Sequence, residues 1–432
     1  MAACAFVLIG CGDGDQLSHS GEQASPGGGV SGDPIADSLT VFAIDADTSQ
    51  PIARATVRLG AGAAARAIGQ TSADGRLKVS GLGGQPQLVT ISAPGFAAAT
   101  WGMINSSVVT IPLEGLDSVP GNADITVTIP GWEDLAAPAP GNYRVARFAV
   151  SRPSGLEALE VGEGPGLPEC RADKPATGCT ITLNVPSDAT TLMAVIAEGN
   201  DAGTSDISDD VFTMTKIGIV TDLALRPWAT HTATVRLLDD TEVARASVIA
   251  HGPSRDIFQE VVGVPGVTLG KQLLLYPSLG GPNSTFLVPT KSGQFQDAKL
   301  WAVSTAGNGS DTDWSRAYER GVETPVDSDQ DVMLVTNDFI ALPSVTRHST
   351  STYILSSTGT VNRLEFSTEN GEQLKALMFP PLFELAMPVG VLSEPPNAVS
   401  IESFDAVVDP NAFAFPDLAR GATHIAYADA EF

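Results

Sequence analysis

Short apolar runs separated by turn residues dominate the chain from residue 38 onward. These runs are rich in Val, Ile, Leu and Thr, and near the start they cover 39–44, 55–59, 86–93 and 106–113. Asp, Gly, Pro and Ser fill the intervals, as at Asp74-Gly75, and these residue types favour tight turns. Closely spaced short strands with turn signals between them predict antiparallel β-sandwiches.

A weak internal repeat continues this pattern in the second half of the chain. The stretch LMAVIAEGNDAGTSD from Leu192 aligns without gaps with LWAVSTAGNGSDTDW from Leu300. The interval is about the size of one sandwich domain of roughly 100 residues. A partial third copy is expected near the C-terminus, around 422–425.

The composition agrees with many strands and excludes one class of partner. Of 432 residues, 43% are hydrophobic and 17% charged, with 43 Gly and 30 Pro, which provides apolar cores and dense turns. The 50 acidic residues outnumber the 24 basic ones and leave a net charge of −26. A field of that sign repels phosphate backbones, so we expect no nucleic-acid partner.

A series of positions in the first apolar region follows a recognisable order. The positions are Asp47, Pro51, Ile52, Ala55, Val57, Leu59, Thr71, Asp74, Gly75, Gly81, Leu82, Ala93, Gly95 and Phe96. Residues 38 to about 116 thereby resemble the carboxypeptidase regulatory-like domain. The resemblance implies a transthyretin-like sandwich and a non-catalytic module, of a kind grouped with carbohydrate-binding-like folds.

The segment Leu8-Ile9-Gly10-Cys11 ends a short apolar run at the start of the chain. It resembles the bacterial lipobox, which implies signal cleavage between Gly10 and Cys11 and lipidation of the Cys11 thiol. The first basic residue is Arg54, so we expect the true start site, with a basic segment, to lie upstream. The alternative is a cytosolic protein in which Cys11 is incidental.

Residues 12–34 are rich in Gly, Ser and Asp and predict a flexible tether. Gly12, rather than Asp, follows Cys11, and in enteric-type sorting this favours the outer membrane. The expected location is therefore the bacterial cell envelope, lipid-anchored, at the outer membrane or cell surface.

The expected fold class is all-β, with tandem antiparallel β-sandwich domains, transthyretin-like or Ig-like, after a disordered tether. The expected ranges are a signal segment at 1–10, the anchor and tether at 11–37, a carboxypeptidase regulatory-like sandwich at 38–118, repeat sandwiches at 119–230 and 231–345, and a C-terminal β domain or partial third repeat at 346–432.

Cys170 and Cys179 are the two cysteines that remain once Cys4 is placed in the signal segment and Cys11 at the anchor. Two thiols this close in an exported protein predict a loop-closing disulfide, which contributes roughly 2–3 kcal/mol. The alternatives are a redox pair, which prefers two intervening residues, and a metal site, which needs further ligands nearby.

Acidic loops follow the matching strands of the two repeat copies. They carry Asp201, Asp206, Asp209 and Asp210 in the first copy, and Asp311 and Asp313 in the second. Carboxylate oxygens are the ligands that Ca²⁺ prefers, so these residues are candidates for a calcium site. The alternative is a solvated acidic loop, and no other cofactor is expected.

The motifs of common enzyme classes do not occur in the sequence. No two of the five histidines have metal-ligand spacing, and neither a G-x-S-x-G elbow nor a phosphate-binding glycine loop is present. We therefore expect a non-enzymatic surface binding or structural protein with a protein or polysaccharide partner. A carbohydrate-binding protein is one alternative, and it predicts exposed tryptophans on a shared face. A secreted hydrolase is the other, and it predicts a perturbed carboxylate or a Ser/His pair in a cleft.

Overall fold

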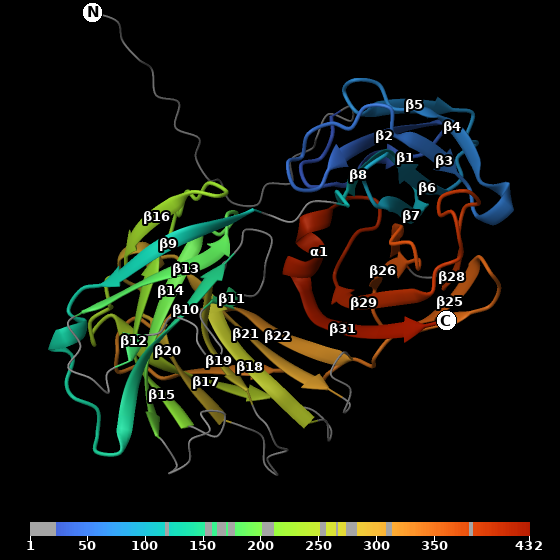
Figure 1. Cartoon of the computed structure of the whole chain (residues 1–432). Helices are drawn as coiled ribbons and strands as arrows, with labels where there is room; N and C mark the ends of the chain where they lie inside the picture. Colours follow the sequence, from blue (N-terminus) through green and yellow to red (C-terminus); the bar gives the residue numbers. More distant parts are fainter. Residues whose placement is uncertain are drawn as a thin grey trace, which may run out of the picture.

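The computed structural model describes residues 23–432 except 117–120, 152–157, 162–169, 172–177, 201–210, 251–255, 265–266, 274–282, 308–312 and 380–382. The described chain is all-β, which confirms the expected fold class, and its strands form four units, each of two layers (Figure 1). Among the described residues, the one α-helix is α1 (Phe415–Gly421), and none is long and apolar enough to cross a membrane.

The first unit contains strands β1 to β8. One layer has the order β1-β8-β2-β5, and the other has the order β7-β6-β3-β4. The bounds are β1 (Gly29–Pro34), β2 (Ser38–Asp45), β3 (Thr56–Leu59), the 3-10 turn η1 (Gly62–Ala64), β4 (Arg66–Gln70), β5 (Arg76–Ser80), β6 (Gln87–Ser92), β7 (Ala98–Ile104) and β8 (Ser106–Leu113).

The second unit contains strands β9 to β16. Its layers are β13-β9-β16 and β11-β10-β14-β15, with β12 beside β10. The bounds are β9 (Asn122–Ile129), the 3-10 turn η2 (Trp132–Asp134), β10 (Asn142–Ser151), β11 (Ala158–Val161), β12 (Cys170–Arg171), β13 (Cys179–Pro186), β14 (Thr191–Asn200), β15 (Val211–Val220) and β16 (Thr230–Thr234).

The third unit contains strands β17 to β23. Its layers are β20-β17-β23 and β19-β18-β21-β22. The bounds are β17 (Val243–Ala250), β18 (Asp256–Val264), β19 (Val267–Leu273), β20 (Asn283–Pro289), the 3-10 turn η4 (Gly293–Phe295), β21 (Lys299–Gly307), β22 (Trp314–Glu323) and β23 (Val332–Thr336).

The fourth unit contains strands β24 to β31 and helix α1. Its layers are β24-β25-β28 and β27-β26-β29-β31, while β30 pairs with β1 of the first unit. The bounds are β24 (Ser344–Arg347), β25 (Thr352–Ser356), β26 (Val361–Ser367), β27 (Gln373–Met378), β28 (Glu384–Ala386), β29 (Ala398–Ala406), β30 (Phe413–Ala414) and β31 (Ala422–Glu431).

One pairing pattern recurs in these units. In each of the first three units, one strand has an antiparallel partner on one side and the unit's last strand, in parallel, on the other. This strand is β2 between β5 and β8, β9 between β13 and β16, and β17 between β20 and β23. In the fourth unit β25 pairs antiparallel with both β28 and β24. The repeat detected in the sequence therefore corresponds to a repeated strand topology. The domain boundaries at 118, 230 and 345 stay predictions.

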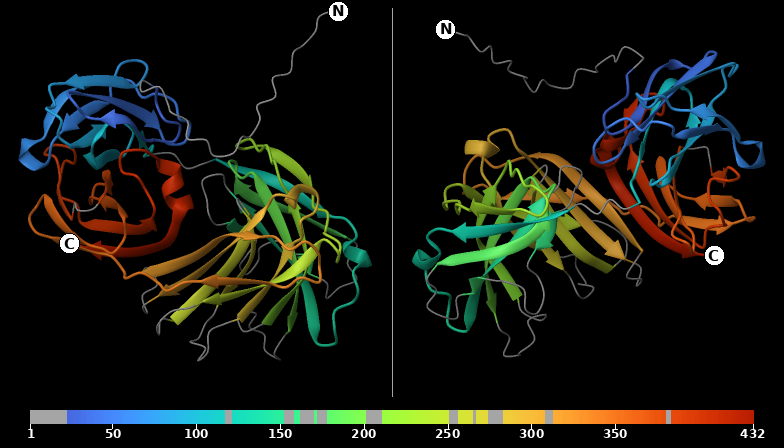
Figure 2. Two further views of the ribbon diagram at one scale, coloured as in Figure 1. Left: turned by 180° about the vertical axis from the view of Figure 1, so that it is seen from behind. Right: turned by 45° about the horizontal axis from the view of Figure 1, so that its top comes forward.

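One layer from each of the first, third and fourth units joins into a single sheet of twelve strands. The first unit contributes β7, which pairs in parallel with β27 of the fourth unit, and the third contributes β22, which pairs antiparallel with β31. The first and last parts of the described chain therefore lie side by side, as the blue and red ribbons show from several directions (Figures 1 and 2).

The cores cross the same boundaries. Trp101 of β7, Trp301 of β21 and Ile425 of β31 belong to one apolar cluster. Met193 of β14 and Ile217 of β15 pack with the third unit's residues rather than with their own unit's core. The first, third and fourth units therefore share a core as well as a sheet, and the second unit packs against the third through Met193 and Ile217.

Candidate functional site

The lipobox and most of the candidate calcium ligands lie outside the described residues. Gly10 and Cys11 precede residue 23, and Asp201, Asp206, Asp209, Asp210 and Asp311 fall in the gaps at 201–210 and 308–312. Cleavage, lipidation and calcium binding at these positions therefore stay predictions.

Asp313 is the one candidate calcium ligand within the described residues. Its Oδ1 accepts a hydrogen bond of 3.2 Å from the backbone N–H of Asp429, at the pairing of β22 with β31. In the described part of the chain, His, Cys, Asp and Glu residues form no group of three or more that could hold a metal ion. The observed contact of Asp313 is thus a structural one, between two units.

Cys170 and Cys179 form a disulfide, as the sequence predicts, with their Cα atoms 5.5 Å apart. Cys170 pairs with Ala146 of β10, and Cys179 pairs with Ile129 of β9. Both cysteines are buried in the second unit's apolar cluster. The bond therefore links the two layers of the second unit across its core.

The tryptophans have different environments. Trp132 and Trp301 are core residues with exposed fractions of 2% and 6%. Trp314 is half-buried, and its ring stacks on that of Tyr427 with centroids 5.4 Å apart. Trp228 is 87% exposed, the highest exposure of any described tryptophan. A row of exposed tryptophans does not form among the described residues, although Trp228 itself is available to a partner.

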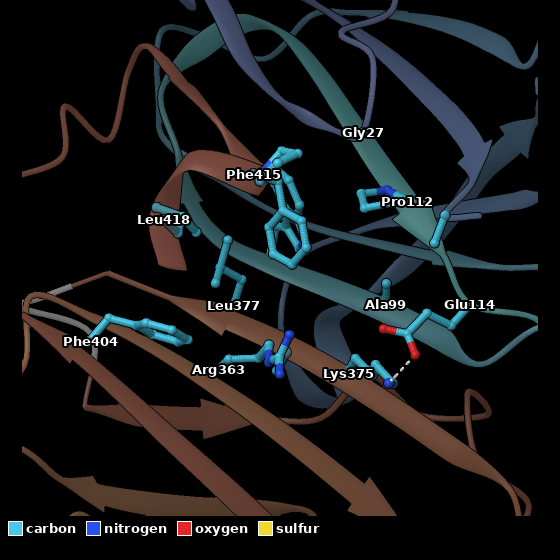
Figure 3. Close-up of a pocket in the computed structure, with 14 residues that line it drawn as sticks. Gly27, Ala99, Pro112, Glu114, Arg363, Lys375, Leu377, Phe404, Phe415 and Leu418 are labelled. Atoms are coloured by element: carbon cyan, nitrogen blue, oxygen red, sulfur yellow. Dashed lines mark hydrogen bonds and ion pairs between the residues drawn. The ribbon is translucent and has the colours of Figure 1, made fainter. Parts of the chain in front are cut away.

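A cavity of about 260 Å³, which we call the seam cavity, lies where the first and fourth units meet (Figure 3). Trp101 and Ala99 of β7, Leu377 of β27, Phe404 of β29 and Phe415 of α1 form much of its apolar wall. The ring of Trp101 lies 5.6 Å from that of Phe415, centroid to centroid. The parallel pairing of β7 with β27 brings these residues together from opposite ends of the sequence.

The charged groups at this cavity are paired with one another. The Lys375 ammonium forms an ion pair with Glu114, drawn in Figure 3, and lies 3.1 Å from Glu365. Arg363 lies 2.5 Å from the carboxylate of Glu402. These pairs link the end of β8 to β27 and β26 to β29, and they offer a ligand little unpaired charge.

The cavity lining has limited chemistry. Its residues include one carboxylate, that of Glu114, and no imidazole, thiol or hydroxyl side chain. A mostly apolar wall, in which the carboxylate of Glu114 and the ammonium of Lys375 are paired with each other, suits packing or weak apolar binding. The cavity is therefore part of the packing contact between the first and fourth units.

A second cluster joins the second unit to the third. The guanidinium of Arg236 donates two hydrogen bonds, of 2.8 and 2.9 Å, to the carboxylate of Glu242. The backbone N–H of Asp239 donates another, of 2.9 Å, to the same carboxylate. These bonds, chiefly those from Arg236, lower the pKa of Glu242 from 4.5 to about 2. The perturbed carboxylate thus closes the connection between β16 and β17.

His424 and Asp405 form the pair nearest to the hydrolase alternative. The His424 Nδ1 lies 3.3 Å from Asp405 Oδ2 and 3.0 Å from the hydroxyl of Thr423. The Thr423 hydroxyl also donates to the backbone carbonyl of Asp405. Neither His424 nor Asp405 lines the cavity between the first and fourth units, and the two residues are direct partners in the pairing of β31 with β29.

Sequence reasoning missed one surface, which we call the hydroxyl face. It consists of the outward residues Thr126 and Thr128 of β9, Thr180 and Thr182 of β13, and Thr232 and Thr234 of β16. The signal was present as Thr at every second position in ITVTI, CTITL and THTAT. Because strands far apart in sequence share the face, only their pairing reveals it.

Comparisons with known proteins do not assign the chain to a family. No family model and no curated protein matches it. It is similar to several solved structures at low identity. The TIE protein of Bacillus anthracis is 9% identical, with 70% of this chain and 50% of that chain covered and a TM-score of 0.16. This chain thus spans about half the length of that protein.

Two more of these structures are pilins. GBS52, the minor pilin of Streptococcus agalactiae, is 10% identical over 46% of this chain and 94% of its own, with a TM-score of 0.16. The shaft pilin spaA of Lactobacillus rhamnosus GG is 10% identical over 48% and 99%, with a TM-score of 0.15. Similarities of this size carry no argument about this chain's function. The carboxypeptidase regulatory-like resemblance rests on its own residues.

Proposed function

We propose that this protein is a non-enzymatic protein of the bacterial cell envelope, which a lipid on Cys11 holds at the membrane and which presents binding faces on one rigid body. The observation that carries the proposal is the sheet of twelve strands that runs through three of the four units. Separate domains on a string would each keep an unpaired sheet edge, whereas here β7 and β22 are paired by strands of the fourth unit.

The contacts between units support rigidity in three ways. The ladder from β7 to β27 covers residues 98–101 and 374–377, and the ladder from β22 to β31 covers 314–317 and 424–427. A common apolar cluster lies beside both ladders. The Lys375–Glu114 ion pair adds a polar contact at the first of them. Moving the first or the third unit against the fourth would break a ladder and open the apolar cluster, so these three units keep a fixed geometry.

The anchor and tether account for the placement of this body. The structure places Gly29–Pro34 of the expected tether in β1, paired with β8, so the Gly/Ser-rich segment that remains between Cys11 and β1 has an r.m.s. reach of roughly 20–25 Å. That distance lifts a rigid body clear of lipid headgroups and leaves its outer faces accessible to a protein or polysaccharide partner. The seam cavity fits the same role, because its paired charges and apolar wall favour packing over reaction.

Cell fractionation tests the anchor. The wild-type chain should incorporate labelled palmitate and sediment with membranes, and protease added to intact cells should degrade it. Cys11→Ser should lose the label and no longer sediment with membranes. The matched variant Cys170→Ser should keep the label and still sediment with membranes. An unlabelled wild-type chain, or a membrane-bound Cys11→Ser variant, contradicts the lipid anchor.

Hydrogen exchange of the full chain tests rigidity. The amides at 98–101 and 374–377 should exchange only with the opening of both units, with one common free energy. Exchange at this ladder far below the opening energies of its two units would mean that they separate easily. That result contradicts a single rigid body.

A further inference from the structure

We propose that the hydroxyl face of the second unit, together with Trp228, is a binding site for a neutral polysaccharide. The site extends the proposed surface role by naming a ligand class, and it lies on the β13-β9-β16 layer, away from the seam cavity. Its parts are a flat array of hydroxyl groups and one aromatic ring at the end of the array.

The hydroxyl face is a regular array. Thr126 and Thr182 are cross-strand partners with hydroxyl oxygens 3.1 Å apart, and Thr128 and Thr180 are partners 3.2 Å apart. Thr232 of the third strand pairs with Thr126. Neighbouring strands lie about 4.8 Å apart, so each row presents closely spaced hydroxyls. A hydroxyl has one donor and two acceptor positions, and a bond to its neighbour leaves the others for a ligand.

Amide groups extend the array toward Trp228. Asn122 Nδ2 donates to Asn184 Oδ1 at 2.6 Å, and Asn184 Nδ2 donates to Asp124 Oδ1 at 2.9 Å. The backbone N–H of Trp228 donates to the Asn122 carbonyl at 2.8 Å. Trp228, which precedes β16 in the chain, therefore lies beside the start of β9, at the end of the polar rows.

The backbone of Trp228 is unusual. The Ala229 N–H donates to the Arg226 carbonyl at 3.2 Å, which closes a turn with Pro227 second and Trp228 third. At φ +61° Trp228 has the left-handed conformation that this turn position normally reserves for Gly or Asn. A large apolar side chain that is both strained and 87% exposed gains nothing from folding. Such a combination is characteristic of residues kept for an external contact.

The indole is held from one side only. The indole Nε1 lies close to Gly121, because a Cβ built on that glycine would be 3.4 Å from it, and Pro227 would be 2.8 Å from the same Cβ. Gly121 thus leaves room for the turn to approach the start of β9. With one edge fixed and most of its surface in solvent, the ring is available for stacking.

Sugar chemistry fits this site better than other polymers do. A pyranose ring has an apolar C–H face, which stacks on indole, and hydroxyls around its rim, which bond to threonine and amide groups. A protein partner would need a cluster of apolar anchors, and the face has one. The net charge of −26 repels polyanions, and the threonines of the hydroxyl face carry no charge to attract an ionic polymer, so a neutral chain fits best.

The third unit shows that the topology does not require this surface. Its equivalent layer, β20-β17-β23, has one hydroxyl pair, Ser247 and Thr285, at outward positions. Its other outward residues include Arg245, Ile249, Leu287 and Met333, and Met333 is 64% exposed. The two layers share their strand pairing but not their outward chemistry. The threonine array is thus a property of the second unit alone among these two repeats.

Affinity electrophoresis of the purified full chain tests the site. The gels contain laminarin, xyloglucan, mannan or dextran, or the anionic polygalacturonate and alginate. At least one neutral polymer should retard the wild-type chain. Trp228→Ala should weaken that retardation about tenfold, and Thr182→Val should weaken it by about threefold. The matched variants on the third unit, Met333→Ala and Thr285→Val, should bind as the wild type does.

Three results would overturn the proposal: no retardation by any neutral polymer, retardation by the anionic polymers only, or undiminished retardation of Trp228→Ala. Trp228→Gly separates binding from folding, since glycine accepts the turn conformation and the variant should fold well and bind as weakly as Trp228→Ala. Failure here leaves the rigid, anchored body untouched, because fractionation and hydrogen exchange test that separately.

Discussion

The second and third units have the same strand topology but differ in what they present. In both, the strand of the detected repeat contains a continuous apolar run, 192–197 in β14 and 300–303 in β21. Leu192 and Met193 are about as buried as Leu300 and Trp301. A strand with both faces buried has a continuous apolar run rather than an alternating one. The repeat in the sequence therefore records burial on both faces, while the outward positions of the smaller layers are free to diverge.

The two units also differ in how they are held. The third unit's strand β22 is paired by β31, so a neighbouring unit completes that edge. The corresponding strand β15 pairs with β14 and, at Gly218, bridges to Leu237, and its unit contains the Cys170–Cys179 disulfide. Strand pairing with a neighbouring unit thus stabilises the third unit, whereas a disulfide stabilises the second. This comparison can be tested.

The largest expected effect comes from removing the disulfide. Cys170→Ala with Cys179→Ala should lower the free energy of unfolding of the second unit by roughly 2–3 kcal/mol, because the closed loop restricts its unfolded chain. Hydrogen exchange in β9 and β13 should report the loss. Protection in β17 and β20 serves as the control, and an equal loss there would show that the bond stabilises the whole body rather than one unit.

Two glycines in corresponding strands, Gly218 of β15 and Gly321 of β22, should respond differently. A Cβ on Gly218 would lie 2.7 Å from the Arg236 carbonyl oxygen, whereas Gly321 has open space but φ +73°. Gly218→Ala should cost about 2 kcal/mol through overpacking, and Gly321→Ala about 1 kcal/mol through backbone strain. Urea denaturation measures both. If Gly321→Ala lowered the free energy of unfolding more than Gly218→Ala, crowding at Gly218 would not be the larger effect.

Relieving the turn at Trp228 should stabilise the second unit. Trp228→Gly should raise the free energy of unfolding by about 1 kcal/mol, since glycine accepts a positive φ without strain. Trp228→Ala is the matched control and should bring little gain, because alanine keeps the strained conformation. Thermal denaturation of both variants distinguishes them, and equal stability would mean that the turn is not strained.

The junction between the two units should give the smallest effect, and it depends on pH. The folded pKa of Glu242, about 2, is below the ordinary 4.5, so its stabilisation is complete above about pH 4.5 and disappears as the pH falls toward 2. Because Arg236 is 64% exposed, the gain is about 0.5–1 kcal/mol. Glu242→Gln should therefore be less stable than the wild type at pH 7 and equally stable near pH 2. A constant difference in urea denaturation would contradict this.

Local patterns in the sequence predicted much of the fold. The alternation in CTITLNVP became a strand with Ile181 and Leu183 inside and threonines outside. The Asp74-Gly75 turn is present, with Gly75 at φ +72° and its N–H bonded to the Ser72 carbonyl at 3.0 Å. These features depend on neighbours within a few residues, and for that reason short-range rules suffice.

The candidate sites were less predictable. The acidic loops were chosen by composition, and the contact observed for Asp313 is a bond to the backbone of Asp429, a residue far along the chain. The seam cavity needs β7 beside β27, and no local pattern encodes which edges of two sheets will pair. The hydroxyl face likewise became visible only when β16 was placed in parallel beside β9.

The sequence by itself determined the all-β class, the disulfide, the turns and the inward side of alternating strands such as β13, since residue types and their period of two set these locally. The tertiary structure alone decided that the first and fourth units share a sheet, that Trp101 and Phe415 line one cavity, and that threonines of three strands meet on one face. The reason is physical: backbone edges bond to any strand, so the choice of partner depends on the fit of whole surfaces.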